Sequence, residues 1–198
     1  YPNEECVQTS GIVTAVDAYN NFYLSDGTGS TWGGIYVFDA NNISPTIGQE
    51  LSITAMVDEY FGLTQLLPGF TSADNTGNGN VAPVSVSGGD VPLLCDVSGE
   101  PYEGMLVRVS NVSVSTSCNE FGEWNVDDGS GEEIMIDNKI FDGENWPCPI
   151  AECQEFASIT GLVHYEYSTF KILPRNMNDF DYNGFPEADA GDPQLIPP

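Results

Sequence analysis

The chain has 198 residues, and its 30 Asp and Glu residues against 4 Lys and Arg residues give a formal net charge of −26. Phosphate contacts to nucleic acid or anionic lipid need clustered basic residues, and the four here are scattered along the sequence. The hydrophobic content of 40% is sufficient for a packed core, so the acidity does not indicate disorder. No apolar run is long enough to span a membrane as a helix.

The apolar segments are short and β-branched, and Gly, Pro, Asn and Ser separate them, which is typical of strands joined by turns. The first set of expected strands comprises residues 11–17, 22–25, 34–38, 50–57 and 63–67. A polar segment follows, with a short extended stretch at 81–86 and a single helical turn at 90–97. The second set comprises residues 105–115, 123–127, 133–136, 154–163 and 169–173. The sequence therefore predicts an all-β protein.

The two sets of strands repeat one another. The tetrapeptide that begins at Asp26 (DGTG) recurs at Asp128 (DGSG), 102 positions later. The hexapeptide that begins at Ser52 (SITAMV) recurs at Ser158 (SITGLV), 106 positions later, and the downstream LLP and ILP tripeptides share that offset. This self-similarity indicates a duplicated module. We expect Asp26 to superpose on Asp128, and Ser52 on Ser158.

The repeat divides the chain into four parts. We expect a first module at residues 1–70, a linker with a short extended segment at 71–99, and a second module at 100–182. Residues 183–198 are rich in proline and lack periodicity, which predicts an extended tail.

Five strands with a Gly-rich turn between the second and third follow the order of an OB-fold, a small Greek-key barrel. The segments GIVTAV, FYLSDGTG, GIYV, GQEL and YFGLTQL resemble the OB-fold modules of bacterial secreted and surface nucleases. EPYEGMLVRV, which begins at Glu100, resembles the entry into a second such module. The resemblance implies two tandem five-stranded OB-fold-like barrels. It also implies an accessory part rather than an enzyme, because hydrolysis in that family belongs to a separate nuclease domain.

Catalytic residue patterns are sparse. His164 is the only histidine, so a two-histidine nuclease site or a histidine metal cluster cannot be assembled within this chain. Its place in the alternating stretch 163–167 is that of an ordinary strand residue. The many acids offer carboxylate pairs, but none is singled out, and we expect no enzymatic activity.

Bound calcium is a plausible partner for so acidic a chain, since Ca²⁺ prefers oxygen-rich loops and relieves repulsion between carboxylates. Asp127, Asp128 and Glu132 surround the second Gly-rich turn, and Asp26 begins the first, so these four are the candidate ligands. The alternative is that the aspartates only form turns, because Asp-Gly is a favoured hairpin turn in its own right.

Five cysteines lie in loop-like contexts: Cys6, Cys95, Cys118, Cys148 and Cys153. None forms a paired CxxC arrangement, so disulfides in an oxidising compartment are expected rather than a zinc site. Cys6 and Cys95 precede their respective modules and are expected to pair. Cys118 has two candidate partners, Cys148 and Cys153. The acidity and the cysteines together predict a secreted or cell-surface protein.

The preferred functional hypothesis is a secreted, non-enzymatic structural protein of the cell surface or extracellular matrix, which self-assembles into filaments stabilised by divalent cations. Leu195 and Ile196 would dock the tail on another copy, although a simple linker is the alternative for this segment.

The competing hypothesis is an accessory module of a larger secreted enzyme that binds nucleic acid or glycan. Tyr23, Tyr36 and Trp124 would stack on the ligand. The net negative charge opposes nucleic acid unless divalent metal bridges the two.

Overall fold

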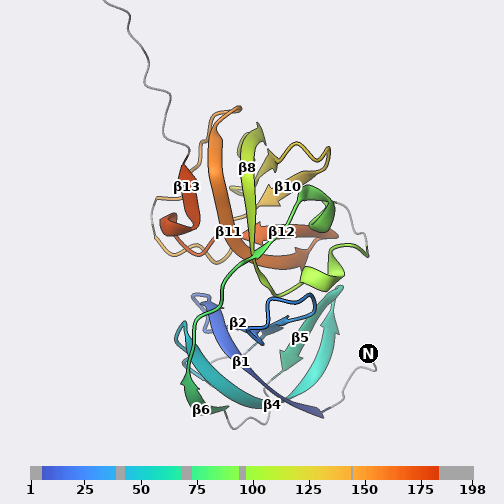
Figure 1. The fold of residues 1–198 in the computed structure, drawn as a ribbon, viewed down its shortest axis with the longest axis vertical. Coiled ribbons are helices and arrows are strands. Elements are labelled where there is room, and N and C mark those ends of the chain that lie inside the picture. Colours follow the sequence, from blue (N-terminus) through green and yellow to red (C-terminus); the bar gives the residue numbers. More distant parts are fainter. Residues whose placement is uncertain (1–5, 39–42, 68–72, 94–96, 144, 183–198) are drawn as a thin grey trace, which may run out of the picture.

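The computed structural model describes residues 6–38, 43–67, 73–93, 97–143 and 145–182. Strands and turns make up nearly all of this part of the chain, with three single-turn 3-10 helices and no α-helix. The strands form two β-barrels, which Figure 1 shows one above the other. The all-β prediction and the prediction of two tandem five-stranded barrels are confirmed.

Barrel 1 is formed by β1 (Cys6–Val16), β2 (Phe22–Ser25), β3 (Gly34–Val37), β4 (Gln49–Tyr60) and β5 (Leu63–Leu67). The strand order is β1-β2-β3-β5-β4, and pairing of β1 with β4 closes the barrel. β3 and β5 run parallel, whereas the other pairs are antiparallel. A further strand, β6 (Ala73–Asn78), pairs with β4. The segment expected to be a linker thus contributes a strand to the first sheet.

Barrel 2 repeats this arrangement with β8 (Leu106–Thr116), β9 (Trp124–Asp127), β10 (Glu133–Ile136), β11 (Glu155–Glu166) and β12 (Thr169–Leu173). Pairing of β11 with β8 closes it, and β10 and β12 form the parallel pair. Two short strands extend the sheet: β7 (Val84–Ser85) lies beside β8, and β13 (Phe180–Tyr182) lies beside β11.

The strand registers support the duplication. Ser52 of β4 pairs with Ser10, and Ser158 of β11 pairs with Ser110 at the corresponding place. The first strand of each barrel also carries a register shift against the second strand, between residues 13 and 15 in barrel 1 and between 114 and 116 in barrel 2. Asp26 and Asp128 both follow the second strand of their barrel directly.

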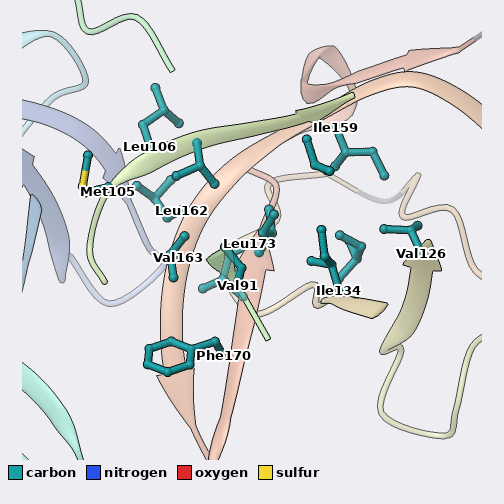
Figure 2. Close-up of a cluster of buried hydrophobic side chains, with 14 of the residues drawn as sticks. Val91, Met105, Leu106, Val126, Ile134, Ile159, Leu162, Val163, Phe170 and Leu173 are labelled. Carbon is teal, nitrogen blue, oxygen red and sulfur yellow. The ribbon is translucent and has the colours of Figure 1, made fainter. Parts of the chain in front are cut away.

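Alternating residues fill each barrel, as expected for strands with one face inward. In β4, Leu51, Ile53 and Ala55 are buried, and the residues between them are only partly covered. Barrel 2 has the larger core, and Figure 2 shows Leu162, Leu173 and Ile134 from three different strands meeting within it.

One buried cluster spans both barrels, and the interior of barrel 1 forms a second cluster of its own. The buried cluster of barrel 2 extends without interruption to Ala15, Tyr23, Tyr36 and Leu63 of barrel 1. The backbones also approach closely, since a Cβ atom on Gly34 would lie 2.5 Å from the carbonyl oxygen of Gly104. This position therefore requires glycine. The barrels are packed against each other as parts of one unit.

One expected disulfide is present: Cys118 and Cys148 are bonded, with their Cα atoms 6.0 Å apart. Cys6 and Cys153 are exposed free thiols, so Cys6 is not in the pair expected for it. Its expected partner Cys95 lies outside the described residues. Leu195 and Ile196 also lie outside the described part of the chain.

Among the described residues, no helix has the length and apolar character needed to span a membrane.

Candidate functional site

A depression of about 710 Å³ opens on the outer surface of barrel 2. It lies over β10 and β12, between the loop that precedes β9 and the turn that joins β11 to β12. It combines aromatic, basic and acidic side chains with Met135 and Thr169. The lining consists of Phe121, Glu123, Met135, Asp137, Lys139, Glu166, Tyr167, Thr169 and Lys171.

Two exposed aromatic side chains border this depression. Phe121 is 70% exposed in the loop before β9, where its backbone N–H donates to the Asn119 side chain at 2.9 Å. Tyr167 is 87% exposed at the tip of the β11–β12 hairpin. Tyr167 and Ser168 both have left-handed backbone angles, with φ of 52° and 64°. The left-handed conformation is unfavourable for residues that carry a Cβ atom, so the turn that places Tyr167 at the surface costs stability.

A buried ion-pair group forms the floor of the depression. Lys171 Nζ lies 2.5 Å from Glu123 Oε1 and 2.9 Å from Asp137 Oδ2, and its side chain is only 3% exposed. Burial alone would lower the pKa of Lys171, but the hydrogen bonds to Asp137 and Glu123 outweigh burial and raise it. The ammonium also lies 5.8 Å from the ring centre of Tyr167. These contacts fix a cation beneath an exposed ring.

The local charge of the site is close to neutral. A second pair joins Lys139 Nζ to Glu166 Oε1 at 2.6 Å, so two lysines face three carboxylates across the depression. Half of the basic residues of the chain therefore gather at this one place. The depression differs in this respect from the strongly acidic chain as a whole.

The equivalent face of barrel 1 is covered. Tyr36 of β3 pairs with Gln65 of β5, as Met135 pairs with Lys171 in barrel 2. In barrel 1, however, Tyr36 is buried against barrel 2, whereas its counterpart Met135 is only partly covered; Gln65 and Lys171 are both buried. Only barrel 2 keeps this face open.

The expected stacking role of Tyr23, Tyr36 and Trp124 does not fit their positions. Tyr23 and Tyr36 belong to the core shared by the barrels, and Trp124 stacks on Phe156 and Phe180 inside barrel 2. All three are buried, so a base or a sugar cannot reach their rings in the packed structure.

His164 lies in β11, as expected for a strand residue, and its side chain contacts barrel 1. Its Nδ1 atom lies 2.9 Å from the hydroxyl of Tyr23, across the interface, and Tyr36 packs edge-on against its ring. Burial lowers the pKa of His164 to about 3, with a further contribution from Lys139 and Lys171. Burial also raises the pKa of Tyr23 well above its usual value. The contact is therefore a neutral hydrogen bond.

The candidate calcium ligands serve as turn residues. Asp26 Oδ1 accepts the backbone N–H of Thr28, and Asp127 Oδ1 accepts that of Gly129. Asp128 Oδ2 accepts the N–H of Gly88 at 3.0 Å, which ties the linker to barrel 2. Glu132 is exposed nearby. Within the described ranges, no three acidic, cysteine or histidine residues come together as a metal site.

The residues that line the open face of barrel 2 were not among those expected from the sequence to form a site. The repeat did contain a signal for it, because Tyr167 and Lys171 lie 106 positions after Phe61 and Gln65. Phe121 has no such signal, since its loop differs in sequence from the corresponding loop of barrel 1.

Neither protein-family models nor curated proteins match this chain.

Proposed function

We propose that the chain is a non-enzymatic binding module whose second barrel takes an oligosaccharide. The observation that carries the proposal is the pair of exposed rings, Phe121 and Tyr167, at a depression floored by the Lys171 ion pairs. Aromatic faces pack on the apolar face of a sugar ring, while charged side chains exchange hydrogen bonds with its hydroxyls. In OB-fold barrels, the second and third strands with the adjacent loops form a surface that binds oligosaccharides or oligonucleotides.

The charge of the chain favours a neutral ligand over a nucleic acid. Lys139 and Lys171 are already paired with carboxylates, so they offer little to a phosphate backbone. The rest of the chain is strongly negative and would repel a polyanion. A neutral oligosaccharide meets no such repulsion.

The test measures binding of neutral oligosaccharides to the full chain by isothermal titration calorimetry, with cellohexaose, chitohexaose and laminarihexaose as the first ligands. Tyr167→Ala should weaken binding by about tenfold, which is the loss expected for one stacked ring. Phe61→Ala is the matched control, because Phe61 is 85% exposed on the corresponding hairpin of barrel 1. Equal losses in both variants, or binding of single-stranded DNA in place of every oligosaccharide, would contradict the proposal.

A second candidate function is the structural one, a secreted subunit that self-assembles with divalent cations. The packing of the two barrels into one unit supports it, since a rigid subunit transmits its orientation to a neighbour. The Cys118–Cys148 disulfide is in keeping with an extracellular site of action.

Light scattering with and without Ca²⁺ tests the structural candidate. Assembly that requires Ca²⁺ and disappears when residues 188–198 are deleted would support it. A full chain that stays monomeric in Ca²⁺ would contradict it.

A further inference from the structure

A second cavity, of about 530 Å³, opens at the side of barrel 1 next to the segment that enters barrel 2. β1 pairs with β2 from Ile12 onward, and the residues of β1 before that point border the cavity. The opposite border is the 3-10 helix η2 (Glu100–Tyr102) with Glu103. A cavity of this size suits a small organic molecule.

Apolar side chains and one exposed indole form much of the lining. The apolar part comes from all five strands of barrel 1 and comprises Val7, Leu24, Ile35, Val57 and Leu66. Trp32 also lines the cavity and is 68% exposed, with a left-handed backbone at φ 66°. Its backbone N–H donates to the carbonyl oxygen of Pro101 at 2.6 Å, which holds the loop beside η2. The cavity thus offers apolar surface and an accessible aromatic ring.

Glu103 places an unpartnered carboxyl oxygen in this apolar setting. The residue is only 8% exposed. Its Oε1 accepts the backbone N–H of Thr64 at 2.9 Å, whereas its Oε2 is buried with no hydrogen-bond partner. Glu100 and Asp26 also line the cavity, and none of the described lining residues is basic. A buried carboxyl oxygen without a hydrogen-bond partner is costly, so a ligand that pairs with this group would remove a cost present in the free protein.

We propose that this cavity binds an aliphatic primary amine, whose ammonium group pairs with Glu103 and whose alkyl chain lies on the apolar wall. An ammonium donates to the carboxylate form of Glu103 and neutralises part of the acidic lining. The Trp32 ring adds a favourable surface for a cation. A bare metal ion fits less well, because among the described residues no three acidic, cysteine or histidine side chains come together to hold one. This site is separate from the oligosaccharide face of barrel 2 and does not depend on it.

Binding should release a proton. Burial, with a smaller contribution from Glu100 and Glu59, raises the pKa of Glu103 to about 8, so at neutral pH the carboxyl group holds its proton. The ammonium stabilises the carboxylate form, and the carboxyl proton passes to the solvent as the ion pair forms. The ligand itself keeps its three ammonium hydrogens and no covalent bond changes.

The experiment is calorimetric titration of the full chain with 1-pentylamine at pH 7, in two buffers of different ionisation enthalpy. We expect saturable binding with release of up to one proton. The isosteric alcohol 1-pentanol should bind about tenfold more weakly or not at all. Glu103→Gln should weaken amine binding by about tenfold and abolish the proton release. Glu155→Gln, at an exposed carboxylate at the start of β11, is the matched control and should behave as the wild type.

Several results would overturn the proposal. These are equal affinity for pentylamine and pentanol, unchanged amine binding in Glu103→Gln, or binding without proton release at pH 7. Displacement of the amine by millimolar CaCl₂ at constant ionic strength would assign the site to a metal instead. If circular dichroism shows that Glu103→Gln is unfolded, Trp32→Ala replaces it, and unchanged amine affinity in that variant counts against the site.

Discussion

The carboxyl group of Glu103 should make the stability of the protein depend on pH, and one substitution should remove that dependence. Burial, with the repulsion of Glu100 and Glu59, raises its pKa from 4.5 to about 8, although the hydrogen bond from Thr64 opposes the shift. The unfolded chain therefore ionises this group at a lower pH than the folded chain does. Its contribution to stability is complete below pH 4.5 and is lost as the pH rises through 8.

The size of the effect follows from the width of this window. Each pH unit within it changes the free energy of unfolding by about 1.4 kcal/mol. Between pH 6 and pH 8, the loss from this group amounts to about 2 kcal/mol, because the folded state keeps most of its proton until the pH approaches 8. Glu103→Gln keeps an oxygen that can accept the N–H of Thr64 and does not titrate. The variant should therefore gain about 2 kcal/mol over the wild type on going from pH 6 to pH 8.

Urea denaturation followed by tryptophan fluorescence measures this difference at pH 6, 7 and 8. Glu155→Gln removes one exposed carboxylate and serves as the control for net charge. A difference between Glu103→Gln and the wild type that is the same at all three pH values would refute the assignment of a raised pKa to this residue.

Four further predictions concern stability. Gly62→Ala should lower the melting temperature, since Gly62 has φ 92° and a Cβ there would lie 2.5 Å from the Tyr165 ring. Ser168→Gly should raise the free energy of unfolding by about 1 kcal/mol, because glycine adopts the left-handed conformation without strain. A stabilised Gly62→Ala variant or a destabilised Ser168→Gly variant would contradict this reasoning. Lys171→Met should cost about 3 kcal/mol in urea denaturation, because it leaves two carboxylates unpaired, and a neutral result would show that the ion pairs contribute nothing. His164 has a pKa lowered from 6.5 to about 3, so its contribution to the free energy of unfolding is lost as the pH falls through this range, by about 2 kcal/mol between pH 7 and pH 5. His164→Gln should lack that loss. If the stability of the variant and of the wild type fell equally between pH 7 and pH 5, the histidine would be excluded as the cause.

Local chemistry made much of the fold predictable. The strands carry alternating apolar residues, and the Asp-Gly turns after β2 and β9 mark corresponding corners of the two barrels. β6 was missed because the sequence ADNTGN contains turn residues rather than strand formers. It forms a strand because β4 offers it a partner along its edge. Such pairing between distant segments is not visible in the composition of either one.

The candidate site was harder to predict because it depends on how the barrels pack. Tyr23 and Tyr36 lie on strands that bear ligands in OB-folds, and sequence alone favoured them. The structure buries them against a histidine 141 positions away from Tyr23. Phe121 and Tyr167, which have no strand position to distinguish them, are the rings left exposed at the depression.

The core shared by the barrels has a consequence for experiments on fragments. Barrel 1 expressed alone would expose Tyr23, Tyr36 and Leu63 to water as one contiguous apolar patch. Barrel 2 alone would leave His164 without the hydroxyl it contacts. Cutting the chain between the barrels therefore creates two aggregation-prone fragments rather than two independent domains. Thermal unfolding of the intact chain should show a single transition, and the smallest unit worth isolating contains both barrels.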